Sequence, residues 1–507
     1  MKKQFTKNLS INIFAFITNI LVSLWLTPYL IKHLGIIAYG LIPLAMFFSQ
    51  YIGVILNSIN ISIGRHLLIA IQKKQDFLAN KIFNTSFIVV LIFTLIQALI
   101  MLIILFDITY FFSIPKELIN DAIWLFGLTF LGFSFSLIRS VFDTSLFSHN
   151  RLDILRGIDI LQNLFRLGII IFLFLYDEPS LKNVGIANFL SSLLLLLPSI
   201  HFFRKYTPQI KINFKYFDRL TAKELSNMST WILINQVGVL LLGNLDLYLV
   251  NILISNKATG EYAIILQITN MLRMSAIVLV GVMAPITLIY YAKQEFKKLK
   301  MFIMLVSKLL AIFIAIPIAI AIYFSAELLT MWLGTDYNYL ANIVSFSMLF
   351  LLVAVPIMPF YQLNIAHNKL KVPALVTILF GILNFAIIYL IVKNTNFGLS
   401  AFIAAKLFFV IAYNAIFMPY YVSRFINLNS KSIAFIPLLS ILTFLVFFGA
   451  LVFLVPLLAV NNIFKILLIS VTLTLLLTPI LIYLLISSDE RTFIHSLYKK
   501  KIKKIQT

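Results

Sequence analysis

The feature that most constrains this 507-residue chain is a series of fourteen apolar stretches separated by short loops. A helix needs about 20 apolar residues to cross the hydrocarbon core of a bilayer, and every stretch meets that length within the error of its boundaries. The sequence therefore predicts an all-α membrane protein with fourteen transmembrane helices. The predicted spans are Leu9–Leu30, Ala38–Ile61, Ile82–Phe106, Ala122–Phe142, Leu155–Tyr176, Val184–Phe203, Leu225–Ile254, Tyr262–Tyr291, Phe302–Phe324, Leu340–Leu363, Val372–Val392, Leu399–Tyr421, Ile433–Leu457 and Ile463–Ile486.

The basic charge of the loops switches on and off in alternation along the chain. Of the 40 Lys and Arg residues, 31 lie in the N-terminal segment, in every second loop and in the C-terminal tail, whereas the opposite loops hold six. Basic loop residues are retained on the cytoplasmic side of a membrane. One wrong span would invert the pattern from that point on. The alternation therefore supports both the number of spans and a cytoplasmic location of both termini.

Composition narrows the class of protein further. With 61% hydrophobic and 11% charged residues, the chain is not expected to be soluble, and in lipid its backbone polar groups must pair within each helix. The net charge of +22 does not indicate nucleic acid, because most of the cations stand where the topology requires them. The absence of cysteine excludes disulfides and thiol chemistry. The apolar run from Leu9 is too long for a signal peptide, so we expect it to remain as the first helix.

The longest cytoplasmic loop, residues 201–224, divides the spans into six and eight. A weak internal repeat agrees with this division. Tyr39-Gly40 follows the first span and Gly260-Glu261-Tyr262 follows the seventh, a shift of about 223 residues that also places Asn12 over Asn235. We predict two six-helix lobes in a pseudo-two-fold arrangement, followed by two more helices. The predicted domains are 1–203 (spans one to six), 204–224 (a basic cytoplasmic linker), 225–424 (spans seven to twelve) and 425–507 (the last two spans and the basic tail).

The fifth span carries a polar stripe. Arg156, Asp159, Asn163 and Arg166 follow one another at helical spacing, with Gln162 beside them. Lipid does not accommodate such a stripe, so it lines either a water-filled cavity or a polar seam in which Asp159 pairs with an arginine. The cavity is favoured, because a seam seldom needs two arginines and two amides.

Shorter polar stripes occur on the first two spans. Asn12 and Asn19 share a face of the first, and Asn57 lies on a polar face of the second, with Arg65 just beyond its cytoplasmic end. A single amide in a membrane helix usually bonds to a neighbouring helix. Aligned stripes on three helices of the first half instead favour a shared central cavity.

Three ionisable residues lie inside later spans, although each costs ~3 kcal/mol on insertion scales. Arg273 lies near the middle of the eighth span. Asp246 in the seventh and Lys406 in the twelfth lie at similar depths. These two residues form either an ion pair or a site at which Asp246 binds a proton or Na⁺ in competition with the cation. The sequence leaves both readings open.

Catalytic and cofactor-binding patterns are not found in the sequence. The six histidines lie in loops or at span ends, and no two have the spacing of metal ligands. The sequence also has no glycine-rich phosphate-binding loop of the P-loop type. We therefore expect a protein that is not an enzyme, has no cofactor and does not hydrolyse ATP.

Several short motifs occur together with the fourteen spans. They are Pro28-Tyr29-Leu30, Leu34-Gly35, Tyr39-Gly40, and Asp246 followed by Gly260 and Tyr262. The pattern resembles the polysaccharide transporter family of the multidrug/oligosaccharidyl-lipid/polysaccharide exporter superfamily, over most of the chain. The resemblance implies a flippase of the bacterial inner membrane. Such a protein moves undecaprenyl-diphosphate-linked oligosaccharides, the repeat units of O-antigen or capsule, to the outer leaflet by ion-coupled alternating access.

A cargo of this kind needs cations for its diphosphate and amides for its sugars, and arginine suits phosphate because its planar fork binds two oxygens. The expected partners are the lipid-linked glycan, membrane lipids, a proton or Na⁺, and the glycan polymerase machinery. The protein itself is expected to be a monomer. The resemblance also implies an apolar groove for the polyprenyl tail on the last two spans. The predicted substrate-binding residues are Arg166, Arg273, Arg139, Arg65, Asn163, Gln162, Asn57 and Asn12, and the predicted ion-coupling residues are Asp246, Asp159 and Lys406.

Three other functions are compatible with the same architecture. A multidrug extruder would prefer acidic residues in its cavity, whereas the embedded cations Arg166, Arg273 and Lys406 outnumber the embedded acids Asp159 and Asp246. A lipid II flippase would share the diphosphate-polyprenyl carrier. A glycan polymerase or ligase is the least favoured, because the outer loops are short and contain no arginine.

Overall fold

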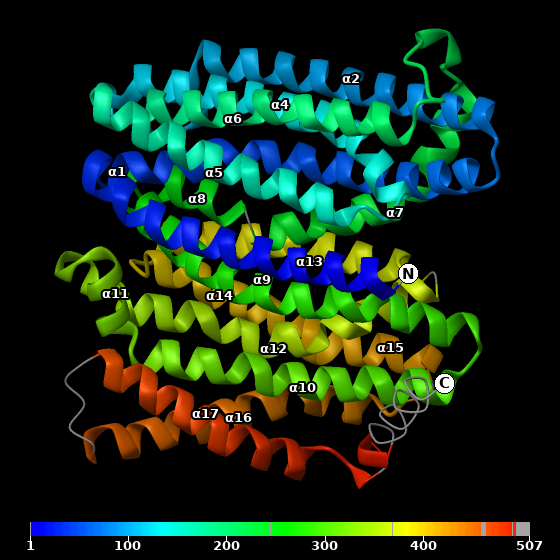
Figure 1. Cartoon of the computed structure of the whole chain (residues 1–507). Coiled ribbons are helices and arrows are strands. Elements are labelled where there is room, and N and C mark those ends of the chain that lie inside the picture. Colours follow the sequence, from blue (N-terminus) through cyan, green and yellow to red (C-terminus); the bar gives the residue numbers. More distant parts are fainter. Residues whose placement is uncertain are drawn as a thin grey trace. The chain divides into compact units, whose positions relative to one another are not determined.

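The computed structural model describes residues 2–243, 245–367, 369–426, 428–457, 463–488 and 490–492. Within these ranges the chain is helical and contains no β-strand (Figure 1). Three short 3₁₀ segments (Lys116–Leu118, Phe214–Tyr216 and Thr335–Leu340) and a π-helical turn (Ala412–Phe417) join or interrupt the helices. The α-helices are α1 (Lys2–Gln72), α2 (Asp76–Phe106), α3 (Ile108–Phe111), α4 (Ile119–Ser148), α5 (Leu152–Tyr176), α6 (Leu181–Tyr206), α7 (Arg219–Gly243), α8 (Leu245–Leu253), α9 (Asn256–Ala292), α10 (Phe296–Tyr323), α11 (Ser325–Leu333), α12 (Ala341–Ala366), α13 (Lys371–Asn394), α14 (Leu399–Ile411), α15 (Met418–Ile426), α16 (Ser430–Leu457) and α17 (Ile463–Leu485).

Twelve helical stretches of the described residues are long and apolar enough to cross a membrane. The chain is therefore a multi-pass membrane protein, as its hydropathy predicts. The first two predicted spans both lie on α1, and the fourteenth lies on α17, whose apolar stretch Ile469–Leu485 is shorter than the others. Fourteen spans and two cytoplasmic termini remain predictions.

The helix α1 carries two predicted spans because it bends without ending. Gly35 has φ 81° and ψ 162° at the bend, a conformation that glycine adopts without steric penalty. Five residues further on, Gly40 packs against the backbone of Gly260 in α9. A Cβ atom added to Gly40 would lie 2.6 Å from the Gly260 nitrogen. The two helices touch backbone to backbone because neither residue has a side chain.

The chain forms two compact units, and each is described by itself. Unit 1 comprises residues 1–264 and 374–399, and unit 2 comprises residues 265–373 and 400–507. The predicted linker 204–224 lies inside unit 1. The predicted division into two six-helix lobes and two further helices remains a prediction.

In unit 1, α4 packs against α1, α2 and α6, and α5 packs against α1 and α6. Figure 1 shows α2, α4 and α6 side by side. Three rings hold these helices together: Phe203 of α6 stacks on Phe83 of α2 at 4.5 Å between centroids and meets Phe142 of α4 edge-on at 5.3 Å. Phe83 is fully buried, so the three phenylalanines form the centre of an apolar core.

In unit 2, α10 packs against α12, α16 and α17. Lys308 of α10 also forms an ion pair with Glu490, which follows α17, at 2.7 Å between Nζ and Oε2. The same Glu490 oxygen accepts a hydrogen bond from the Ser487 backbone nitrogen at 2.8 Å. The pair therefore fixes the residues that follow α17 against α10.

Candidate functional site

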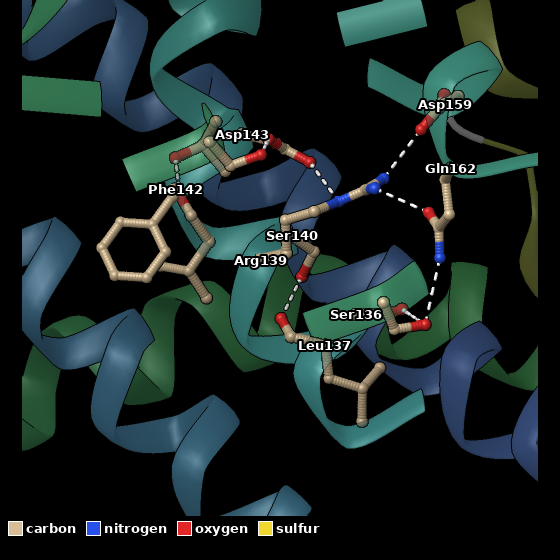
Figure 2. Close-up of polar contacts among 12 residues, drawn as sticks. Ser136, Leu137, Arg139, Ser140, Phe142, Asp143, Asp159 and Gln162 are labelled. Atoms are coloured by element: carbon tan, nitrogen blue, oxygen red, sulfur yellow. Dashed lines mark hydrogen bonds and ion pairs between the residues drawn. The ribbon is translucent and has the colours of Figure 1, made fainter. Parts of the chain in front are cut away.

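Arg139 of α4 is the centre of a polar cluster in unit 1 (Figure 2). Its Nε donates to Oδ2 of Asp143, one turn further along α4, at 3.1 Å. Its Nη2 donates to Oδ1 of Asp159 and its Nη1 to Oε1 of Gln162, each at 2.7 Å and both on α5. The guanidinium thus extends between an acid of its own helix and two groups of the neighbouring one.

Two serines of α6 complete the cluster. Ser199 Oγ donates to Oδ1 of Asp143 at 2.7 Å, and Gln162 Nε2 donates to Ser192 Oγ at 3.1 Å. Ser136 of α4 donates to the same Ser192 oxygen at 3.3 Å. Because Asp143 and Gln162 each bond to a serine of α6 as well as to Arg139, the cluster joins α4, α5 and α6.

The cluster continues to α1 along the predicted polar stripe. Arg156 Nη1 donates to Oδ2 of Asp159 at 3.1 Å, and its Nε donates to Oδ1 of Asn12 at 2.9 Å. Two turns beyond Arg156 on α5, Asn163 donates to the side chain of Asn19. The amides of the first and fifth predicted spans therefore face each other.

These contacts form the interhelical polar seam that the sequence left as the alternative to a cavity. Its two arginines and two aspartates balance in charge, and its exposure rises toward one edge. The exposed fraction of the side chain is 12% for Arg139, 27% for Asp159 and 47% for Arg156. A cavity alongside this open edge remains a prediction.

A second polar cluster lies beyond the end of this seam that is nearer to the start of α5. Asp153 is buried and accepts from Lys7 at 2.8 Å and from Arg151 at 3.1 Å. The hydrogen bond and the charge of Asp153 raise the pKa of Arg151. Asn8 of α1 also accepts from the Asp153 backbone nitrogen, at 3.1 Å. This cluster fixes the start of α1 to the turn between α4 and α5.

Two predicted site arginines have no polar partner in the described part of the chain. Arg166 of α5, in unit 1, has a buried Nε without a hydrogen bond. Arg273 of α9, in unit 2, is half-buried and forms no hydrogen bond or ion pair with a described residue. An arginine at membrane depth is costly without a partner, so each is suited to an anion or to water.

Asp246 of α8 is fully buried, and its Oδ2 accepts a hydrogen bond from the Tyr262 hydroxyl at 3.0 Å. The predicted repeat partner of Tyr262, Tyr39, is also buried, and its hydroxyl lies 3.4 Å from the Thr27 hydroxyl. Both tyrosines thus bond back to the helical segment that precedes them.

Lys406 of α14, in unit 2, lies over the ring of Phe350, 5.0 Å from its centroid. A pairing of Lys406 with Asp246 remains a prediction, because the two residues belong to different units. The side chains of Asn57 and Arg65 lie outside the described residues.

Sequence reasoning missed Asp143, Ser192 and Ser199, which satisfy the inner end of the seam. Asp143 stands four residues after Arg139, and this spacing is the signal that could have paired them. The two serines gave no such signal, because single serines are common in membrane helices. Among the described residues, no group of three or more acidic or histidine side chains is arranged to hold a metal ion.

No family model matches this chain. It is 28% identical over 421 residues, 83% of either protein, to the uncharacterized membrane protein EpsK of Bacillus subtilis strain 168. Its fold is similar to the inward-facing conformation of a multidrug resistance MATE family transporter of the MOP superfamily. That likeness has a TM-score of 0.64 at 14% identity and covers 83% of this chain and 98% of the other.

A second solved structure is a MOP superfamily transporter from Pyrococcus furiosus, described as having a binding pocket of reverse polarity. It has a TM-score of 0.62 at 15% identity and covers 83% of this chain and 96% of that one. Both likenesses extend over nearly the whole of the solved transporters. This chain therefore has the fold of the MATE transporters of the MOP superfamily.

Proposed function

We propose that this protein is a flippase that moves polyprenyl-diphosphate-linked oligosaccharides from the cytoplasmic to the outer leaflet by alternating access. The cargo combines a doubly charged diphosphate, polar sugars and a long apolar tail. A protein that transports it needs a different surface for each part, and the chain offers a candidate for each.

The observation that carries the proposal is the pair of unpartnered arginines at membrane depth. Arg166 and Arg273 bond to no described carboxylate, unlike Arg139 and Arg156, whose charges Asp143 and Asp159 compensate. A guanidinium binds two oxygens of a phosphate in one plane. The uncompensated charge is thus positive, which favours an anionic cargo.

The open edge of the seam offers hydrogen-bonding groups to sugar. Asn163 and Asn19 are paired with each other at this edge, and Asn12 is paired there with Arg156. Such amides retain further donors and acceptors for hydroxyl groups. Gln162 and Arg139 lie deeper. They make their hydrogen bonds to other side chains of the protein and hold the open edge in place.

The apolar tail has a candidate groove on α17. A cavity of about 620 Å³ is lined there by Thr474, Leu475, Pro479 and Ile482, with Arg491 at one end. Most of the lining surface is apolar, and Thr474, Thr478, Tyr483 and Arg491 supply its polar atoms, which suits a polyprenyl chain that ends in a phosphate.

The fold neighbours agree with transport as the general function. One of them is described as a multidrug resistance transporter, and another as having a pocket of reverse polarity that suggests a different function. We infer from its embedded arginines that this chain transports an anion.

A multidrug extruder is the second candidate, and the buried Asp246–Tyr262 pair favours it. A carboxylate inside the membrane suits an organic cation or a coupled proton. In the proposed flippase, the same Asp246 binds the coupling ion. Asp159, the other predicted ion-coupling residue, has two arginine partners, which favours Asp246 for that role.

The test is a deletion strain complemented with variants of the gene, at equal protein level in the membrane. The double variant Arg166→Gln/Arg273→Gln is expected to abolish surface glycan, with lipid-linked repeat units accumulating on the cytoplasmic face. Each charge-assisted contact is worth ~2 kcal/mol, so each single variant should slow flipping in proteoliposomes roughly 30-fold. The Arg→Lys double variant keeps the charge but loses the fork, and should be intermediate.

The matched control is Lys182→Gln/Lys393→Gln, which removes one charge from the first turn of α6 and one from the last turn of α13, at their predicted outer ends, and should leave surface glycan unchanged. Full glycan in the Arg166/Arg273 double variant would overturn the role of these arginines. Normal glycan in the deletion strain itself, together with sensitivity to cationic drugs, would assign the protein to multidrug extrusion instead.

A further inference from the structure

The segment between α6 and α7 is bound to the side of α2 by two asparagines. Asn80 Nδ2 donates to the Gln209 carbonyl at 3.0 Å, and its Oδ1 accepts from the Lys211 nitrogen at 2.7 Å. Asn84 repeats this one turn later: it donates to the Lys211 carbonyl at 2.8 Å and accepts from the Asn213 nitrogen at 2.7 Å. We call residues 209–218 the strap.

The match between helix and strap is geometric. Four residues of a helix rise about 6.0 Å, and two residues of extended chain rise about 6.6 Å. Asparagines at i and i+4 on α2 therefore meet backbone groups at i, i+2 and i+4 of the strap, as a neighbouring strand would. Both asparagines are buried, Asn84 completely, so these bonds replace water on the inner side of the strap.

The strap follows α2 into the apolar part of that helix. Beyond the asparagine pairs, the Phe214 ring stacks on Phe87 of α2, with 6.4 Å between the centroids. Phe87 stands eleven residues after Asp76, the first residue of α2, which corresponds to a rise of about 16 Å. Phe87 is also inside the predicted third span, so the strap reaches the level at which lipid begins.

At this level, irregular backbone needs internal partners, since lipid offers none. The asparagine pairs supply them, and Asp218 closes the strap on the same helix. Its backbone nitrogen donates to Thr85 Oγ1 at 3.0 Å, and its carboxylate lies 3.1 Å from Lys81. A strap surrounded by water would not require a completely buried amide to pair its backbone.

The outer side of the strap carries both apolar and basic side chains. Ile212, Phe214 and Phe217 are 49%, 60% and 44% exposed. Lys211 directly precedes Ile212, and Lys215 follows Phe214; both lysines are exposed and form no ion pair with any described residue. Aromatic rings with interspersed lysines are typical of protein surfaces at the membrane–water interface.

We propose that the strap inserts into the cytoplasmic leaflet and binds anionic phospholipid there, with its rings among the acyl chains and its two lysines on the headgroups. The segment that the loop charge places in the cytoplasm as a linker is thus a membrane-embedded, lipid-binding element of unit 1. The proposal is independent of the transported cargo.

The test uses the absence of cysteine, because a single cysteine can be introduced anywhere in the full-length chain. Spin labels at Ile212→Cys and Phe217→Cys are measured in nanodiscs, with Leu99→Cys as the lipid reference and Lys73→Cys as the aqueous one. We expect oxygen accessibility near that of position 99 and loss of most of the nickel-chelate accessibility seen at position 73. Nickel accessibility equal to that of position 73 would overturn the proposal.

Lipid selectivity is measured separately, by quenching of a fluorophore at position 212 with spin-labelled phosphatidylglycerol or phosphatidylcholine. Each lysine near an anionic surface gives roughly a fivefold preference for anionic lipid, so phosphatidylglycerol should quench the fluorophore several-fold more strongly than phosphatidylcholine. Lys211→Gln/Lys215→Gln should remove this difference, whereas Lys73→Gln/Lys74→Gln should keep it. Equal quenching by both lipids in the unaltered chain, or protection of the label only by added cytosolic protein, would refute lipid binding.

Discussion

At the scale of single residues, Arg139 differs from Arg166 in what it can do. Arg139 bonds to two carboxylates and one amide, so its charge is balanced and its side chain is fixed. The sequence predicted both arginines as ligands of the cargo. The geometry instead favours Arg139 as a positioning residue, which holds α4 and α5 in register. In the proposed flippase, the open edge and Arg166 bind the cargo.

We predict that Arg139→Gln destabilises unit 1 by about 3 kcal/mol, because it leaves Asp143 and Asp159 close together at membrane depth without their shared cation. Thermal unfolding in detergent, with the folded fraction measured by size-exclusion chromatography, measures this loss. Arg424→Gln, which removes an exposed arginine lying over Tyr420, is the control and should unfold as the unaltered protein does.

A second substitution distinguishes charge from packing. Adding Asp143→Asn to Arg139→Gln removes the acid that has lost its cation, whereas Asp159 keeps its pair with Arg156, and should restore much of the lost stability. If Arg139→Gln unfolds at the same temperature as the Arg424→Gln control, the seam contributes nothing to stability, and this account of Arg139 is wrong.

At the scale of elements, the strap shows what hydropathy does and does not predict. The long apolar helices follow from the need for about 20 apolar residues per span, so their positions could be read from the sequence. The docking of the strap on α2 could not. It depends on side-chain amides that meet a backbone 127 to 131 residues away, and two asparagines four residues apart give no sign of that partner.

We predict that Asn84→Ala destabilises the protein by about 3 kcal/mol, because it leaves a carbonyl and an N–H of the strap unpaired away from water. The matched control is Asn394→Ala, since the exposed Asn394 bonds to a carbonyl of its own helix. Proteolysis of the strap reports the effect directly. Equal cleavage of the Asn84→Ala and Asn394→Ala variants would contradict the role of the amide pairs.

The same limit applies to the polar stripes. Helical periodicity predicts that Arg156, Asp159 and Asn163 share one face of α5, and their contacts with one another and with α1 confirm that shared face. Periodicity does not say what faces the stripe. The partners on α4 and α6 depend on how three helices pack, and that information is not local in the sequence.

At the scale of the whole molecule, the contact between α1 and α9 at Gly40 and Gly260 matters most. The sequence indicated these glycines as members of a repeated motif, but not as partners. Their backbones touch, and a Cβ on Gly40 would approach Gly260 to 2.6 Å. A contact this close fixes α1 against the start of α9 more tightly than side-chain packing would.

We predict that Gly40→Ala lowers stability by about 2 kcal/mol, since the added methyl group forces the two backbones apart. Thermal unfolding of the purified protein measures the effect. Gly449→Ala is the control, because a Cβ at that position meets no atom within 4 Å and should leave the unfolding temperature unchanged or slightly raised. An unaltered unfolding temperature for Gly40→Ala would mean that the contact is loose.

The asparagine pairs of α2 also have a consequence for biogenesis. The amides at positions 80 and 84 leave the ribosome roughly 130 residues before the strap that completes them. During that interval α3 to α6 are made, so we expect the first turns of α2 to stay hydrated and α2 to enter the bilayer shallowly at first. We expect its final depth to be set only when residue 213 has been synthesised, and a nascent chain cut short before that point to keep the first turns of α2 in water.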